Sequence, residues 1–84
     1  GVEIYPTLLQ KNAEITLDIS GSKQPQINLQ LFNMTGKIVH SAIFNHPEGK
    51  IQTSVPVESA GLYIMVVKDE IGRVISTEKV IIQD

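Results

Sequence analysis

Apolar and polar residues alternate along much of the chain, with the two-residue period of β-strands that bury one face. The pattern is clearest in two segments, where every second residue is isoleucine or leucine: Ile15, Leu17 and Ile19, then Ile27, Leu29 and Leu31. We expect these side chains to face a core and their polar neighbours to face solvent. No segment shows a convincing helical period.

Turn-forming residues separate the apolar segments at intervals of about eight to twelve residues, the spacing of a β-sandwich or small barrel. The sequence therefore predicts an all-β fold, an immunoglobulin-like antiparallel β-sandwich of about seven strands. The predicted strands are Val2–Tyr5, Glu14–Ser20, Gln26–Phe32, Lys37–Phe44, Lys50–Val55, Leu62–Lys68 and Arg73–Gln83. Leu62–Lys68 is apolar on both faces, which places it at the centre of a sheet.

The last predicted strand changes phase along its length. At every second position Val74 is followed by polar Ser76 and Glu78, whereas Val80, Ile81 and Ile82 are consecutive apolar residues. A β-bulge near Thr77–Lys79 restores the alternation, and we favour it. The alternative is a terminus that leaves the sheet and exposes its apolar residues.

Two hairpin turns share one pattern. Asn33-Met34-Thr35-Gly36-Lys37 matches Asp69-Glu70-Ile71-Gly72-Arg73 in residue type. The Asn or Asp accepts a backbone hydrogen bond that opens a type I turn, and the Gly three residues later takes a positive φ that a Cβ disfavours. We therefore expect two hairpins at these positions.

Length and charge narrow the classes of function. A chain of 84 residues forms one small domain with a thin core. A net charge of −2 without a basic stripe argues against nucleic acid or an anionic membrane surface as a partner. The chain has no cysteine, hence no disulfide framework and no thiolate metal site. Because it opens in strand pattern, we expect a module excised from a larger protein.

No constellation of residues indicates catalysis, a metal or a cofactor. His40 and His46 lack an accompanying carboxylate motif, so we interpret them as surface or half-buried side chains. No serine lies in a Gly-x-Ser-x-Gly elbow, and Asp69-Glu70 lacks the alternating ligands of a calcium loop. We therefore expect a protein that is not an enzyme and that needs no cofactor.

The two tyrosines allow two interpretations, a ligand-binding role and a packing role. Exposed, Tyr5 and Tyr63 would suit a carbohydrate-binding sandwich; packed in the core or at its rim, they need no ligand. Two tyrosines, two phenylalanines and no tryptophan make a poor sugar platform. We therefore favour packing.

Taken in order, the motifs of this chain resemble the C-terminal sorting domain of type IX secretion cargo in Bacteroidetes. In outline, that family opens with YPNP, continues with an lyd-tGk-v hairpin and ends with aGvYfvkv-d--Gk and a strand that reaches the carboxyl terminus. Matching segments stand here at Ile4-Tyr5-Pro6, Leu31–Val39, Ala60–Val67, Asp69 with Gly72-Arg73, and Lys79–Gln83. The opening departs from the family, because Thr7-Leu8-Leu9 replaces its Asn-Pro.

The resemblance implies that residues 1–84 are a single C-terminal sorting domain. Such a domain folds in the periplasm, is recognised by the outer-membrane type IX translocon, and carries its attached N-terminal cargo to the cell surface or the medium. In typical cargo a surface sortase then removes the domain. The departure at Thr7 is also compatible with a resident component that retains it, so cleavage and retention both stay open.

A second interpretation is a non-catalytic fibronectin-like or immunoglobulin-like spacer, or a carbohydrate-binding adhesion module, of a surface protein. The position in the parent gene distinguishes the two, because a sorting domain lies at the extreme C-terminus and a spacer lies anywhere.

The carboxyl-terminal end is the expected point of recognition, since an edge strand offers unpaired backbone groups for strand addition by a partner. The candidate recognition residues are Gly61, Leu62, Tyr63, Gly72, Lys79, Val80, Ile81, Ile82 and Gln83. Removal of residues 80–84 is expected to abolish export and leave the sandwich largely folded. An edge strand or a swapped last strand is also expected to permit a homodimer.

Overall fold

The computed structural model describes residues 1–84 and contains eight strands and no helix. The strands are β1 (Glu3–Tyr5), β2 (Leu8–Gln10), β3 (Glu14–Asp18), β4 (Gln26–Phe32), β5 (Ile38–Asn45), β6 (Lys50–Ser54), β7 (Gly61–Asp69) and β8 (Val74–Gln83). The predicted all-β fold is confirmed. The strand missing from the prediction is β2, and the other boundaries differ from the predicted ones by at most two residues. With no helix, the structure contains no helical segment able to cross a membrane.

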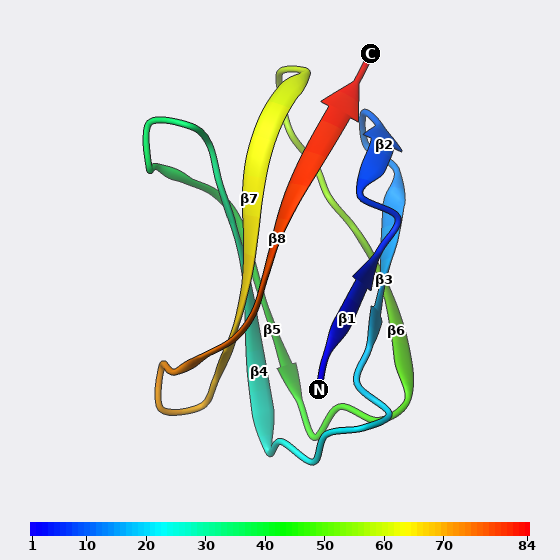
Figure 1. The fold of residues 1–84 in the computed structure, drawn as a ribbon, viewed down its shortest axis with the longest axis vertical. Coiled ribbons are helices and arrows are strands. Elements are labelled where there is room, and N and C mark those ends of the chain that lie inside the picture. The colour runs from blue at the N-terminus through cyan, green and yellow to red at the C-terminus, as the bar shows by residue number, and fades with distance from the viewer.

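The strands form two facing sheets (Figure 1). The first has the order β1-β3-β6, and the second has the order β2-β8-β7-β4-β5. Neighbouring strands are antiparallel except β2 and β8, which are parallel. β7 lies between β8 and β4, which confirms that the doubly apolar segment is central.

The core consists of alternate side chains from the inner faces of both sheets. In the first sheet these include Ile15 and Leu17, which are at most 1% exposed; in the second, Leu29, Met65 and Val67 are fully buried. Burying each such side chain contributes roughly 1.5–3 kcal/mol. The inward positions predicted from the alternation, including Ile19 just beyond β3, are all in this core.

The bulge in the last strand lies at Ile75 and not near Thr77–Lys79. Val67 pairs with Ser76 and Lys68 with Val74, so Ile75 is the extra residue, while pairing through residues 77–79 is regular. The predicted bulge position was therefore wrong, and so was the alternative of a terminus leaving the sheet, because β8 continues to Gln83. The change of phase in the apolar pattern has a different cause: some side chains on the core face of β8 are polar.

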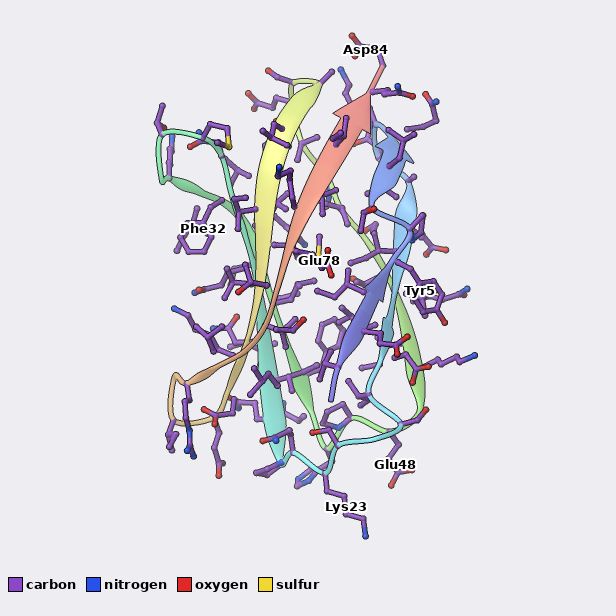
Figure 2. The ribbon with its side chains drawn as sticks, in the orientation of Figure 1. Tyr5, Lys23, Phe32, Glu48, Glu78 and Asp84 are labelled. Carbon is purple, nitrogen blue, oxygen red and sulfur yellow. The ribbon has the colours of Figure 1, made fainter.

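Glu78 is the clearest of these polar side chains. It lies opposite the fully buried Met65 and is itself half-buried. Figure 2 shows it beside β8, on the side toward β1. The sequence pattern was misleading because this part of β8 has no neighbouring strand on one side, since β2 pairs only with residues 81–83, and the carboxylate there is partly exposed.

Both predicted hairpin turns are confirmed. The Asn33 side-chain oxygen accepts hydrogen bonds from the N–H groups of Thr35 and Lys37, each at 3.0 Å. The Asp69 carboxylate accepts the equivalent bonds from Ile71 at 3.1 Å and Arg73 at 2.8 Å. The glycines of both turns have φ of 86°, a conformation that favours glycine.

Candidate functional site

All the candidate recognition residues except Gly72 come together at one end of the β7–β8 ladder. Gly61 pairs with Ile82, Leu62 with Ile81, and Tyr63 with Val80. Lys79 follows opposite Ile64. Gly72 lies in the turn at the opposite end of the same hairpin (Figure 1). The predicted recognition residues therefore form one cluster in space, and Gly72 lies apart from it in a distant turn.

The clustered residues divide between the two faces of the sheet. Tyr63, Val80 and Ile82 are at most 6% exposed and belong to the core. Their neighbours along each strand point outward, because successive side chains alternate between faces. We call these outward side chains the C-terminal surface; they are Leu62, Lys79, Ile81 and Gln83.

Apolar side chains dominate the C-terminal surface and its surroundings. Leu8, Ile81 and Leu62 form one row across β2, β8 and β7, with Leu8 56% and Ile81 47% exposed. A second row joins Ile64 of β7 to Phe32 of β4. The β1-β3-β6 sheet lies on the opposite side of β7 and β8 (Figure 1). Exposed apolar side chains that are contiguous in this way are typical of binding surfaces.

A groove adjoins this surface at the start of β7. Ala60, Gly61 and Leu62 form one wall, and the β4–β5 hairpin contributes Met34 and Ile38 to the other. Met34 and Ile38 are 61% and 46% exposed. The groove therefore extends the apolar surface from the carboxyl-terminal strand to the tip of a separate hairpin.

Gly61 and Tyr63 shape the entry to β7. Gly61 has φ of 152°, a region open to glycine and strained for other residues. The Tyr63 hydroxyl donates a hydrogen bond to the carbonyl oxygen of Ser59 at 2.5 Å, while the ring is buried. The packing role that we favoured is thus confirmed for Tyr63, whose ring is not available to stack on a sugar. It was wrong for Tyr5, which is 39% exposed and lies outside the core.

The end of β8 is not an edge, in contrast to our expectation for strand addition. β2 pairs with it in parallel, from Leu8 opposite Ile81 to Gln10 opposite Gln83. The Ile81 N–H donates to the Thr7 carbonyl oxygen at 2.8 Å, and the Lys11 N–H donates to that of Gln83 at 2.6 Å. Both sides of the backbone of residues 81–83 are therefore occupied, which leaves only their outward side chains open to contact.

Side-chain contacts also join β2 and the residue after it to the end of the chain. Lys11 Nζ lies 3.4 Å from the Asp84 carboxylate, and the amide of Gln10 donates to that of Gln83 at 3.5 Å. The side chain of Asp84 is largely exposed, so the ion pair contributes little on its own. The residues Thr7–Lys11 nevertheless belong to the site, because they fix the strand that carries Ile81.

Sequence reasoning missed these residues because Leu8 and Leu9 are adjacent apolar residues that do not alternate with polar ones. β2 has only three residues. The sequence around it offers only the isolated apolar pair Leu8-Leu9 shortly after Pro6, which does not identify a strand. Leu9 is 4% exposed and faces the core opposite Ile82, whereas Leu8 faces outward.

The distant turn that contains Gly72 is held by hydrogen bonds and an ion pair between Asp69 and Arg73. Hydrogen bonding from the Arg73 N–H lowers the pKa of Asp69 below its ordinary value of 3.8. The Arg73 guanidinium adds an ion pair with the same carboxylate at 3.3 Å. These contacts account for Asp69 and Arg73 as formers of the turn.

No group of His, Asp and Glu side chains in the structure is arranged to hold a metal ion. His46 is exposed, with φ of 50°, and His40 is half-buried on β5. His40 Nε2 is buried without a hydrogen-bond partner. The C-terminal surface offers apolar contact and one ammonium group, which suits binding to a protein.

Comparison with known families supplies the context for this surface. The family model described as "Secretion system C-terminal sorting domain" matches residues 3–83. The match spans nearly the whole chain, so the chain belongs to this family and is a type IX secretion sorting signal. No curated protein and no solved structure matches it.

Proposed function

Since this chain is a member of the secretion system C-terminal sorting domain family, we propose that it is the address by which the outer-membrane type IX translocon exports an attached N-terminal protein. The domain folds in the periplasm, is bound by the translocon, and reaches the cell surface or the medium with its cargo. The family match over residues 3–83 is the observation that carries this proposal. The role needs a binding surface and no catalytic group.

The translocon contacts the C-terminal surface in this proposal. Val80 and Ile82 face the core and are at most 2% exposed, so a partner touches them only after unfolding the strand. Ile81 and Leu62 lie beside each other on the outer face, next to the exposed Leu8. Covering such side chains gains about 25 cal/mol for each Å² of apolar surface removed from water. Lys79 adds a charge that orients the partner.

Processing follows export in this account. In typical members of the family, a surface sortase removes the domain and the cargo stays at the surface. A resident component instead retains it. The mass of the exported reporter distinguishes cleavage from retention when it is compared with the masses calculated with and without residues 1–84.

Deleting the end of the chain does not test recognition cleanly. Removal of residues 80–84 takes away Val80 and Ile82, both core side chains. We therefore correct the expectation that the sandwich stays largely folded after this truncation. Single substitutions on the outer face separate recognition from folding.

The sharpest test compares two exposed apolar positions on the outer face of β8. Ile81→Ser changes the C-terminal surface, and Val74→Ser, the matched control, changes a side chain 54% exposed at the far end of the strand. Each variant is fused behind a reporter in a type IX-competent bacterium, and surface reporter is quantified. We expect roughly tenfold less export for Ile81→Ser and no loss for Val74→Ser, as for a central binding residue and a remote one. Equal export from both variants, each folded, would place recognition elsewhere.

A further inference from the structure

The four edges of the two sheets differ in how they are protected from pairing with another strand. β1 has three residues and is followed by Pro6, and β6 begins with Lys50 and is followed at a short distance by Pro56. The edge opposite β5 consists of the three-residue β2 and the open part of β8, which carries Lys79 and the core-facing Glu78. Short strands, prolines, lysines and inward charges are devices that block edge pairing.

Within its own residues β5 carries none of these devices beyond one bulge at its start; Lys37 and Pro47 lie outside it, before its first residue and two residues after its last. Its eight residues, Ile38–Asn45, contain no charged residue and no proline. The irregularity in its pairing with β4 is confined to the first residues, and the register from His40 to Asn45 is continuous. Ile43 is 57% exposed on its outer face. A long, regular and uncharged edge of this kind is suited to strand addition.

The unpaired backbone groups of β5 can be assigned from its pairing with β4. The His46 N–H donates to the Pro25 carbonyl oxygen at 2.8 Å, so residues of even number in this strand direct their backbone groups toward β4. The N–H and C=O groups of Ser41, Ile43 and Asn45 therefore point away from the sheet. β5 has no neighbouring strand on that side.

We propose that β5 pairs with β5 of a second copy of this chain, antiparallel and about a two-fold axis at Ile43. This register places Ile43 opposite its own symmetry mate, Ser41 opposite Asn45, and Ala42 opposite Phe44. Apolar side chains meet apolar ones and polar meet polar, with no like charges opposed. It forms roughly six backbone hydrogen bonds, two for each hydrogen-bonded pair. An isologous contact of this kind requires such self-complementarity.

The dimer leaves the C-terminal surface free. β5 is at one edge of the second sheet, and β8 lies toward the other edge beside β2. Two copies joined at β5 form one continuous sheet with a C-terminal surface in each half. The proposal is thus independent of the proposed function, and either can fail without the other.

The dimer is tested with two isoleucine-to-lysine variants of the chain. Ile43→Lys places like charges opposite each other at the two-fold axis. Ile71→Lys, the matched control, makes the same charge change at a turn residue that is 73% exposed. Sedimentation equilibrium up to about 1 mM covers the weak range expected of a contact limited to strand edges. We expect the wild-type chain and Ile71→Lys to dimerise alike and Ile43→Lys to dimerise at least about tenfold more weakly.

Amide hydrogen exchange locates the contact. The amides of Ser41 and Ile43 are expected to exchange more slowly as the concentration rises, while that of Thr77, at the open part of β8, does not change. A wild-type chain that stays monomeric at about 1 mM overturns the proposal. So does a dimer that Ile43→Lys, shown to be folded by its thermal unfolding, leaves intact.

Discussion

The carbonyl oxygen of Thr7 accepts a hydrogen bond from the N–H of Ile81 at 2.8 Å. This contact joins the segment that follows β1 to the strand that ends the chain. Because β2 continues the pairing as far as Gln83, residues 81–83 of the carboxyl-terminal strand lie between β7 and β2. The N-terminal segment, to which the proposed cargo is attached, thus stabilises the surface that we propose the translocon binds.

This relationship predicts unequal effects for two adjacent leucines. Leu9→Ala removes a core side chain opposite Ile82 and is expected to lower the free energy of unfolding by about 2–4 kcal/mol. Leu8→Ala changes an exposed side chain and is expected to lower it by less than about 0.5 kcal/mol. Urea unfolding of both variants measures the difference. Equal losses would show that β2 does not pack as described.

Gly72 is expected to matter for stability and not for export. Its φ of 86° disfavours a Cβ, so Gly72→Ala is expected to destabilise the domain by about 1 kcal/mol. Gly72→Asn is expected to cost less, because asparagine tolerates positive φ better. Urea unfolding measures both costs, and the reporter assay is expected to show normal export of Gly72→Asn. If this variant is folded but not exported, the β7–β8 turn is part of the recognition site.

The lowered pKa of Asp69 predicts a dependence of stability on pH. Since the folded state holds this carboxyl below its ordinary value of 3.8, its contribution is present above that value and is lost as the pH falls through the folded pKa. Asp69→Asn keeps a turn of the kind that Asn33 forms and removes the titration. The difference in unfolding free energy between the wild-type chain and this variant is expected to shrink on acidification.

The equivalent turn supplies the reciprocal variant. Asn33→Asp places a titrating carboxylate in the same hydrogen-bonding position and is expected to add a loss of stability at acid pH. Urea unfolding from about pH 6 to about pH 2 measures both effects. A constant difference across this range for Asp69→Asn would contradict the assignment of the lowered pKa.

Glu78 is expected to trade stability for protection of the β8 edge. Glu78→Val replaces a half-buried carboxylate opposite Met65 by a strand-forming apolar side chain, so we expect a gain of about 0.5–1 kcal/mol in the free energy of unfolding. Loss of an inward charge also opens the unpaired part of β8 to association. Glu70→Val makes the same charge change at an exposed turn residue and serves as the control. Light scattering that rises for Glu78→Val alone is the expected result; an equal rise for both would indicate an effect of net charge.

The sequence predicted those parts of the fold that repeat a local rule. The alternation at Ile15–Ile19 and Ile27–Leu31 identified the core faces, and the matched turns at Asn33 and Asp69 located two hairpins. β2 was missed because its apolar residues Leu8 and Leu9 are adjacent and do not alternate with polar ones, and because its partner lies at the other end of the chain. Pairing over such a distance leaves no local signal.

The candidate site was located along the chain but not resolved into its two faces. Val80, Ile81 and Ile82 read as one apolar run, and only the register with β7 shows that Ile81 alone points outward. The bulge at Ile75 was misplaced because Ser76 and Glu78, on the core face of β8, look like solvent-facing residues. Their position on a part of β8 that β2 does not reach depends on strand pairing between distant segments, which the local sequence does not indicate.

Export of a passenger tests the central claim most directly. Residues 1–84 are fused behind a periplasm-targeted fluorescent protein and expressed in a type IX-competent bacterium and in a translocon-null strain. We predict the reporter at the surface or in the medium of the competent strain only. Folded, intact fusion retained in the periplasm of both strains would contradict the sorting role.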